Sequence, residues 1–202
     1  MINVNNHSSI QINDIFIDPY GITETNKKAK YIFITHTHYD HLSLEDIKKI
    51  ISKETIFVAP KDAQKTLEEN FPNHEKFYVE PNQELKFDNF EVKVIPAYNI
   101  NKNFHKKEFG WVGYVFKIDS ITYTILGDTD EIPEHEALKT NVLFVPIGGT
   151  YTMNAEEAAL LVNKIKPDLA VPVHYNAIVG SKEDEEIFLE NLDKNIKYQI
   201  FL

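Results

Sequence analysis

The chain contains no cysteine in its 202 residues. This absence excludes disulfide bonds, thiolate nucleophiles and metal sites built on sulfur, so a metal would have to be held by His, Asp or Glu. It also fits a reducing compartment. No basic start followed by an apolar run is visible in residues 1–14, so we expect no signal peptide and a cytoplasmic location.

Long hydrophobic runs and an excess of positive charge are also missing. No apolar run approaches the roughly 20 residues that span a bilayer, so we expect no membrane partner. The chain has 21 basic and 31 acidic residues, and the formal net charge of −10 disfavours binding to nucleic acid. We therefore expect a small-molecule substrate as the partner, and we leave a homo-oligomer open.

The composition is that of one folded domain. Hydrophobic residues make up 43% and charged residues 26% of the chain, a balance typical of globular proteins. No repeat, linker or low-complexity segment interrupts the sequence. We predict a single domain over residues 1–202, long enough to bury a substantial core.

The first third of the chain alternates short apolar strands with helices. Residues 9–19 predict a hairpin, and the apolar runs 31–35 and 55–60 predict strands that are buried on both faces. A helix is expected after each of these two strands, the first of them capped by Ser43.

Residues 75–126 carry several segments that alternate apolar and polar residues, which indicates an antiparallel sheet with one face in water. Strands and helices then alternate again: a strand at 141–147, a helix after Asn154, a strand at 168–175, a helix at about 182–192 and a terminal strand from Ile196. This order predicts an α/β or α+β fold.

Three histidines and one aspartate occupy six positions in the segment HTHYDH, just after the first buried strand. His36 and His38 alternate along an extended segment, so both imidazoles can reach one ion. Asp40 and His41 follow in a turn and can face a second ion. A lone histidine here would be interpreted as a surface residue, but four ligand-type residues in six positions favour a metal site. Imidazole and carboxylate without sulfur suit zinc, manganese or iron, and two such ions can share a water.

Two later motifs also place ligand-type side chains at the ends of predicted strands. Asp128, in GDTD, follows the apolar segment ITYTIL, and Gly127 allows a tight turn there. His174, in PVHY, lies at the end of another buried strand. Taken alone, Asp128 would be a turn residue and His174 a hydrogen-bonded core or surface residue. A two-metal site needs a bridging anion, and Asp128 is the candidate for it.

The motifs HTHYDH, GDTD and PVHY, in this order, resemble those of the metallo-β-lactamase superfamily of dinuclear metal hydrolases. The segments NHSSIQINDIFIDP, PIGGTYTMNAEEAA and PVHYNAIVGS resemble the branch of ascorbate-6-phosphate lactonase-like hydrolases. The resemblance covers nearly the whole chain. It implies a four-layer αβ/βα sandwich, a two-metal site at one edge of the two sheets, and hydrolysis by a metal-bound hydroxide.

The resemblance also assigns ligands. It makes His36 and His38 ligands of the first metal, and Asp128 the bridging carboxylate. Ligands of the second metal would be Asp40, His41 and His174. We expect two divalent ions, with zinc as the first choice and manganese as the alternative.

One ligand position departs from the family pattern. The histidine that the family carries after the segment VKVIPAY is replaced by Asn99 in this chain. An amide oxygen binds zinc weakly, so the first site could prefer a harder metal. His105, six residues further on, could substitute. Three alternatives stay open: His105 ligates, Asn99 ligates weakly, or neither does.

The resemblance gives two residues catalytic roles. His7, in NHSS, matches a histidine that the branch carries near its start, and a role beside the ligands or the substrate is set against simple stabilisation of a turn. Asp40 could also orient the nucleophile or pass its proton to the leaving group. Asp18 is expected to order a loop and to fix the tautomer of a ligand histidine through a hydrogen bond.

Two residues are candidates for substrate binding. Tyr151 follows a Gly-Gly turn and could line the pocket, with aromatic packing as the alternative. Lys107 belongs to a locally basic loop, with Lys102 and Lys106, that could steer an anionic substrate or could simply be solvated.

The function predicted from the sequence is that of a metal-dependent hydrolase acting on a small, anionic substrate, with a lactone or ester as the choice by resemblance. One rival is a phosphodiesterase on the same fold that cleaves a small phosphodiester. The other rival is a non-enzymatic metal-binding protein whose first metal site is degraded at Asn99.

Overall fold

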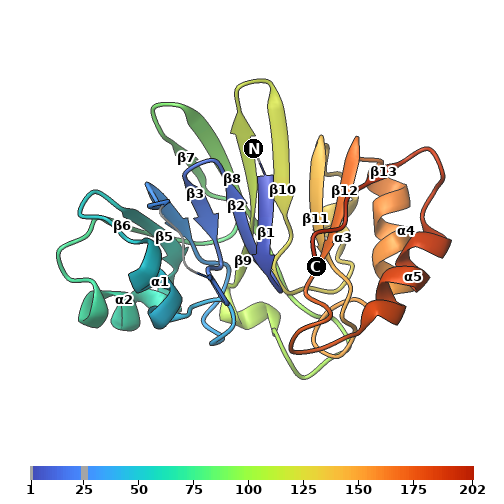
Figure 1. Cartoon of the computed structure of the whole chain (residues 1–202), viewed down its shortest axis with the longest axis horizontal. Helices are drawn as coiled ribbons and strands as arrows, with labels where there is room; N and C mark the ends of the chain where they lie inside the picture. Colours follow the sequence, from blue (N-terminus) through green and yellow to red (C-terminus); the bar gives the residue numbers. More distant parts are fainter. Residues whose placement is uncertain (1, 24–26) are drawn as a thin grey trace. The chain divides into compact units, whose positions relative to one another are not determined.

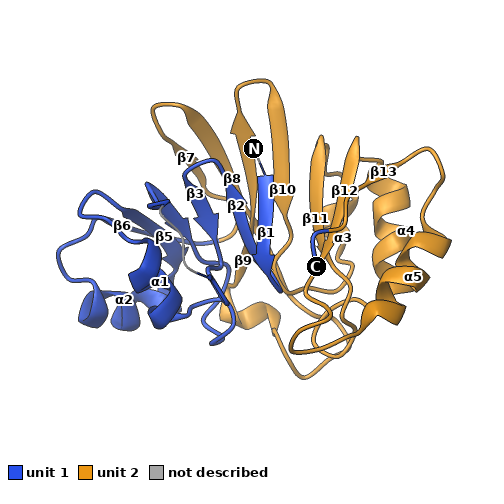
Figure 2. Cartoon of the chain, in the orientation of Figure 1, with its two compact units in different colours: residues 1–80, 201–202 blue, residues 81–200 orange. Residues whose placement is uncertain are grey.

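The computed structural model of the protein describes residues 2–23 and 27–202. The chain divides into two compact units, residues 1–80 with 201–202 and residues 81–200 (Figure 2). Each unit is built on its own β-sheet. The single domain over 1–202 stays a prediction.

The first unit contains a six-stranded sheet in which the strands follow their order along the chain (Figure 1). The strands are β1 (Ile2–Asn6), β2 (Ser9–Ile12), β3 (Ile15–Ile17), β4 (Tyr31–Phe33), β5 (Ile56–Pro60) and β6 (Lys76–Val79). Strands β1 to β3 pair antiparallel and β3 to β6 pair in parallel. The predicted hairpin is confirmed, and its turn residue Asn13 has a φ of 56°, in the left-handed region that asparagine tolerates.

Two helices of the first unit pack on its sheet. They are α1 (Leu44–Ile50) and α2 (Gln64–Asn70), the latter preceded by the 3₁₀ turn η1 (Lys61–Ala63). Ile47, Ile50 and Leu67 share a buried apolar cluster with Ile32 of β4 and Phe57 of β5, and burial of this surface is what holds each helix against the sheet. Ser43 caps α1 as predicted, because its Oγ accepts a hydrogen bond from the backbone N–H of Asp46 at 3.3 Å.

The second unit contains a seven-stranded sheet with the order β13-β12-β11-β10-β9-β8-β7. Strands β7 to β10 pair antiparallel and β10 to β13 pair in parallel. The strands are β7 (Glu84–Lys86), β8 (Phe90–Pro96), β9 (Val112–Ile118), β10 (Ile121–Ile125), β11 (Val142–Pro146), β12 (Leu169–Val173) and β13 (Lys197–Tyr198).

Two differences from the sequence prediction concern the strands. The first strand expected in the 75–126 series is β6, and it pairs in parallel with β5 in the first sheet rather than joining the antiparallel one. It follows α2 and so completes a strand–helix–strand crossover, which favours parallel pairing. The terminal strand expected from Ile196 is only the two residues of β13, because pairing with β12 stops at Tyr198.

The helices of the second unit are α3 (Pro133–Glu136), α4 (Ala155–Ile165) and α5 (Lys182–Asn191), with a 3₁₀ turn η2 (Lys107–Phe109). Helix α4 lies against β11 and α5 packs on α4 (Figure 1). Asn154 caps α4 as predicted, in a capping box with Glu157. The short α3 has no apolar period of its own and was not expected from the sequence.

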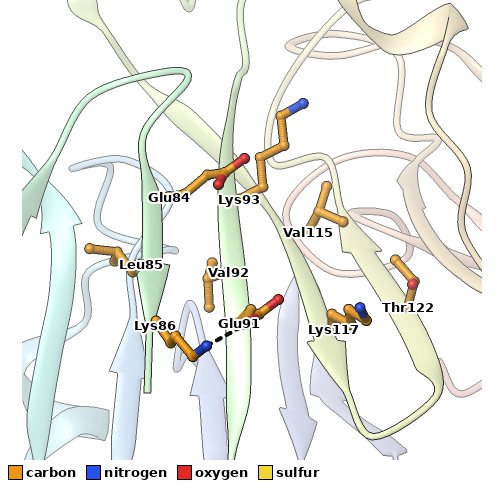
Figure 3. A pocket seen from close by; sticks show the side chains of 9 residues that line it. All are labelled: Glu84, Leu85, Lys86, Glu91, Val92, Lys93, Val115, Lys117 and Thr122. Carbon is orange, nitrogen blue, oxygen red and sulfur yellow. Dashed lines mark ion pairs between the residues drawn. The ribbon is translucent and has the colours of Figure 1, made fainter. Parts of the chain in front are cut away.

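Strands β7 to β9 carry alternating charges on one face, around Val115 (Figure 3). Glu84 lies opposite Lys93 and Glu91 lies opposite Lys86, with 3.4 Å between Lys86 Nζ and Glu91 Oε1. The side chains between them on the same strands, such as Val92 and Val94, are buried. The predicted antiparallel sheet with one polar face is therefore confirmed for this part of the unit.

No helix among the described residues is both long and apolar enough to cross a bilayer.

His135 of α3 is a buried histidine with a structural contact. Its side chain is fully shielded from solvent, and its Nε2 donates a hydrogen bond to the backbone oxygen of Pro96 at 2.8 Å. Burial lowers the pKa of His135 to about 4, because the charged form cannot be hydrated there. The neutral imidazole therefore ties α3 to the end of β8.

Acidification should destabilise the fold through His135. Its pKa is about 4 in the folded chain and about 6.5 when unfolded, so the unfolded state binds more protons between these values. The stability it contributes is complete above pH 6.5 and is lost as the pH falls towards 4, at up to about 1.4 kcal/mol per pH unit. The free energy of unfolding can be measured with urea at pH 7 and at pH 4.5. Its decrease between these two pH values should be about 2 kcal/mol larger for the wild type than for His135→Gln, a variant that keeps an N–H donor. Equal losses in the two proteins would refute this role.

Candidate metal centre

The ligand-type residues of the first unit lie on two loops that leave its sheet. His36, His38, Asp40 and His41 follow the end of β4, and His7 lies in the turn between β1 and β2. The carboxyl ends of parallel strands are where α/β folds place polar side chains for binding. All five are buried except His38, which is partly exposed.

His36 and His38 point their ring nitrogens at one another. His36 Nε2 lies 3.1 Å from His38 Nδ1, and the two rings are nearly perpendicular at 79°. Two donors about 2.0–2.1 Å from a tetrahedral ion are roughly 3.3 Å apart. The separation of the two nitrogens therefore fits two ligands of one ion, as the alternation in the sequence predicted.

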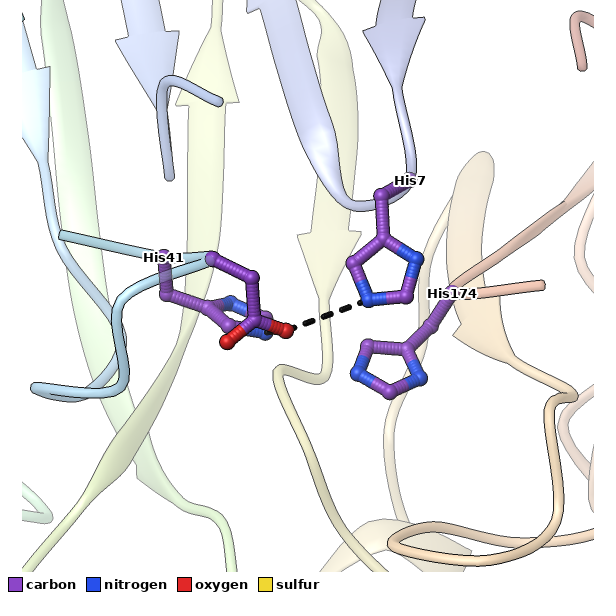
Figure 4. A group of neighbouring side chains, drawn as sticks. His7, His41 and His174 are labelled. Atoms are coloured by element: carbon purple, nitrogen blue, oxygen red, sulfur yellow. Dashed lines mark ion pairs between the residues drawn. The ribbon is translucent and has the colours of Figure 1, made fainter. Parts of the chain in front are cut away.

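Asp40 lies between two histidines. Its Oδ2 is 3.2 Å from His7 Nε2 and 3.5 Å from His41 Nε2 (Figure 4). These three residues each offer a donor atom within 4.8 Å of the others. The separation of Asp40 from His41 again matches donors that can share one ion, and His7, in the β1–β2 turn, lies directly against Asp40.

Asp18 holds His41 in its orientation. His41 Nδ1 donates to Asp18 Oδ2 at 2.8 Å, which fixes the tautomer and leaves Nε2 to face Asp40. Thr35 donates its backbone N–H and its hydroxyl to the same carboxylate, at 2.8 and 2.6 Å. Burial raises the pKa of Asp18, and the hydrogen bonds from His41 and Thr35 oppose that rise. The predicted hydrogen bond between Asp18 and a histidine of the HTHYDH segment is confirmed, with His41 as the donor. Thr35 was missed, although its position directly before HTHYDH was a signal.

The second unit gathers three further ligand-type residues around one carboxylate. Asp128 follows β10, His174 follows β12, and His105 lies in the loop between β8 and β9. Asp128 Oδ2 is 2.9 Å from His174 Nε2 and 3.2 Å from His105 Nε2. All three side chains are buried. A carboxylate oxygen flanked by two imidazole nitrogens at these distances has the chemistry of a shared metal ligand.

Asn99 is engaged in other contacts. Its side-chain amide donates to the backbone oxygen of Tyr151 at 2.7 Å, and its backbone N–H donates to the backbone oxygen of His105 at 2.7 Å. The second contact closes the intervening loop. Asn99 therefore shapes the segment that brings the imidazole of His105 beside Asp128, which favours His105 among the three alternatives.

Several of these residues have a left-handed backbone. Nine described residues other than glycine have a positive φ, and four of them are His7, Asp18, His105 and His174. This conformation costs of order 1–3 kcal/mol for such residues and persists only where the surroundings impose it. The concentration of strain in ligand-type residues is typical of a functional site and has no signature in the sequence.

The two predicted substrate-binding residues lie in the second unit. The ring of Tyr151 packs edge-on against Phe104, with 4.7 Å between centroids. Lys107 Nζ lies 3.0 Å from Glu134 Oε1 and donates to the hydroxyl of Tyr98 at 3.1 Å, and these contacts raise the pKa of Lys107. Its charge is thus balanced within the protein. Substrate binding by Tyr151 and Lys107 stays a prediction.

Residues 3–174 match the family described as the beta-lactamase superfamily domain. A UPF0173 protein of Pyrococcus furiosus is 31% identical over 89% of this chain and 82% of its own length. A UPF0173 metal-dependent hydrolase of Ligilactobacillus salivarius is 27% identical over 95% of this chain and 92% of its own length. Among solved structures, one titled as a metal-dependent hydrolase from Parabacteroides distasonis superposes with a TM-score of 0.83 at 26% identity, covering 99% of this chain and 91% of that one.

These similarities confirm the superfamily and the two-sheet α/β fold that the sequence motifs implied. They do not distinguish the lactonase-like branch from others. The chain belongs to the beta-lactamase superfamily, among the metal-dependent hydrolases of the UPF0173 group.

Proposed function

We propose that the protein opens an ester or lactone bond in a small substrate with the help of two divalent ions. The observation that carries this proposal is the position of Asp128 Oδ2, which lies within 3.2 Å of two imidazole nitrogens in the second unit. The proposed ligands are those that the family motifs carry, with His105 in place of the missing histidine: His36, His38, His105, Asp128, Asp40, His41 and His174.

The donor set suits zinc. Five of the seven proposed ligands are imidazoles and two are carboxylates, and imidazole favours zinc over the harder manganese. Manganese is the alternative metal, because the two carboxylate ligands also suit this harder ion. When bound, such ions lower the pKa of a shared water towards 7 and polarise the bond that is attacked.

The residues around the ligands have separate tasks. Asp18 holds His41 with Nε2 directed at Asp40. His7 can hold a proton at Nε2, 3.2 Å from Asp40 Oδ2, and this pair is placed to take a proton from the nucleophile and return it to the leaving alcohol. Water adds to the carbonyl carbon, the acyl–oxygen bond breaks, and an acid and an alcohol are formed.

A substrate panel tests the proposed reaction. The zinc-loaded protein should hydrolyse lactones and p-nitrophenyl esters, and Asp128→Asn should lower kcat/KM by at least about 10³-fold because a neutral amide would hold a divalent cation far more weakly than a carboxylate. Metal content should fall from two ions per chain, while circular dichroism should show the fold retained. Activity on bis-p-nitrophenyl phosphate alone would instead support the phosphodiesterase.

His105 should be a ligand and Asn99 should not. His105→Ala should lower the bound zinc from two ions to about one per chain, because one imidazole of the first site is lost. The zinc content is measured by inductively coupled plasma mass spectrometry. Asn99→Ala should change the zinc content less, because the amide of Asn99 contacts the backbone oxygen of Tyr151 and Nδ1 of His105, whereas Nε2 of His105 is the atom that faces Asp128. His135→Gln is the matched control, because His135 is equally buried outside these groups. Loss of metal in Asn99→Ala with none in His105→Ala would reverse the assignment.

His7 should transfer protons during the reaction and should not be needed to hold the metal ions. His7→Gln should lower kcat by about 10²-fold with both ions still bound, because general acid–base contributions are of that size. Its kcat–pH profile should also lose one titrating limb. A parallel loss of metal would show that His7 is a ligand instead.

A further inference from the structure

The loop between β8 and β9 exposes large apolar side chains. Ile100 is 55% exposed, and Phe104 and Phe109 are each 46% exposed. Single exposed apolar residues are ordinary on protein surfaces, but a concentration of them marks a site of binding. The other large apolar side chains that the described residues of the second unit expose lie on other elements, namely the β9–β10 hairpin, α4, α5 and β13: Ile121, Leu160, Ile187 and Tyr198.

One of these side chains, Phe109, is linked by ring contacts to His105, the candidate metal ligand of the same loop. Phe104 packs edge-on against Tyr151, and Phe109 contacts Trp111 with 5.0 Å between ring centroids. Trp111 in turn lies 5.2 Å from the ring of His105, whose own side chain is buried. We call the set of Phe104, Phe109, Trp111 and Tyr151 the aromatic loop surface. Its Trp111–Phe109 part begins at the imidazole that faces Asp128 and runs outward to solvent, and its Phe104–Tyr151 pair is fastened to the loop by the hydrogen bond from Asn99 to Tyr151.

The loop is held in place by polar contacts. Its two ends are joined by the backbone hydrogen bond from Ala97 to Trp111, and Asn99 donates to the backbone oxygens of His105 within the loop and of Tyr151 outside it. The backbone N–H of Ile100 donates to Asp130 Oδ2 at 2.9 Å. A loop fastened in this way presents its apolar groups without first having to be ordered, which lowers the entropic cost of binding.

The charges of the loop favour an apolar ligand over an anion. Lys102 forms an ion pair with Asp130, and Lys107 forms one with Glu134. Two of the three lysines that could attract an anion are therefore neutralised by carboxylates of the same unit. The exposed rings are what the loop offers to a ligand.

We propose that the aromatic loop surface binds an apolar acyl or aryl group of the substrate, next to the ester or lactone bond that is hydrolysed. The substrate class is thus an ester or lactone with an alkyl chain of several carbons or an aromatic ring. This inference rests on the proposed hydrolase function for the identity of the bond.

Binding of carboxylates, the acid products of such a reaction, tests the surface directly. Trp111 is the only tryptophan of the chain, so intrinsic fluorescence reports on this surface. Titration of the zinc-loaded protein with acetate, hexanoate and decanoate should give dissociation constants that fall by up to about fourfold per methylene, the value for a fully buried group. Phe104→Ala and Phe109→Ala should each reduce the decanoate-to-acetate affinity ratio at least tenfold. Leu160→Ala, which removes a side chain of similar exposure on α4, should leave the ratio unchanged.

Esters of the same acids separate failure of this inference from failure of the proposed function. If kcat/KM for p-nitrophenyl decanoate exceeds that for the acetate in the wild type and the excess shrinks in Phe104→Ala, both stand. Hydrolysis with no dependence on chain length would overturn the aromatic loop surface and leave the hydrolase function intact. Absence of ester and lactone hydrolysis would overturn the proposed function, while the fluorescence titration would still decide whether the surface binds apolar groups.

Discussion

The buried carboxylate of Asp18 is the contact on which the histidine segment of the first unit depends. Its backbone N–H donates to Phe33 of β4, and its side chain accepts from Thr35 and His41. One residue therefore joins the end of β3 to the end of β4 and orients the imidazole of His41. Its burial is costly for a charge, and three directed hydrogen bonds offset that cost. The arrangement explains why the HTHYDH segment leaves the sheet in one conformation.

Most of the regular structure could be predicted from the sequence because its signals are local. Ser43 and Asn154 cap their helices through contacts within three residues, and the hairpin depends on the turn at Asn13. The pairing of β6 could not be predicted in this way, because it does not depend on a local signal. Its partner is chosen by a crossover through α2, and an alternating pattern in four residues does not contain that information. The same limit applies to α3, which is held by the contact of His135 with Pro96 rather than by its own sequence.

The grouping of ligand-type residues could be predicted where these residues are adjacent in the sequence, and less so where the conformation of a loop brings them together. The HTHYDH segment named four residues because their spacing alone brings them together. His105 could be named only as an alternative, since its approach to Asp128 depends on the backbone contact with Asn99 and on a left-handed φ of 53°. The ion pairs of Lys102 with Asp130 and of Lys107 with Glu134 could not be predicted from the sequence either, because the partners are far apart along the chain.

The ends of the seven-stranded sheet have a consequence for self-association. A sheet edge offers unpaired backbone groups to any strand of another molecule, and long flat edges invite aggregation. Here the outermost strands are β7, with three residues between two charged ends, and β13, with two residues. Neither is long enough to serve as a template for a chain of intermolecular hydrogen bonds. The protein can thus keep an extensive sheet, and an exposed aromatic loop beside it, without its strands recruiting one another into fibres.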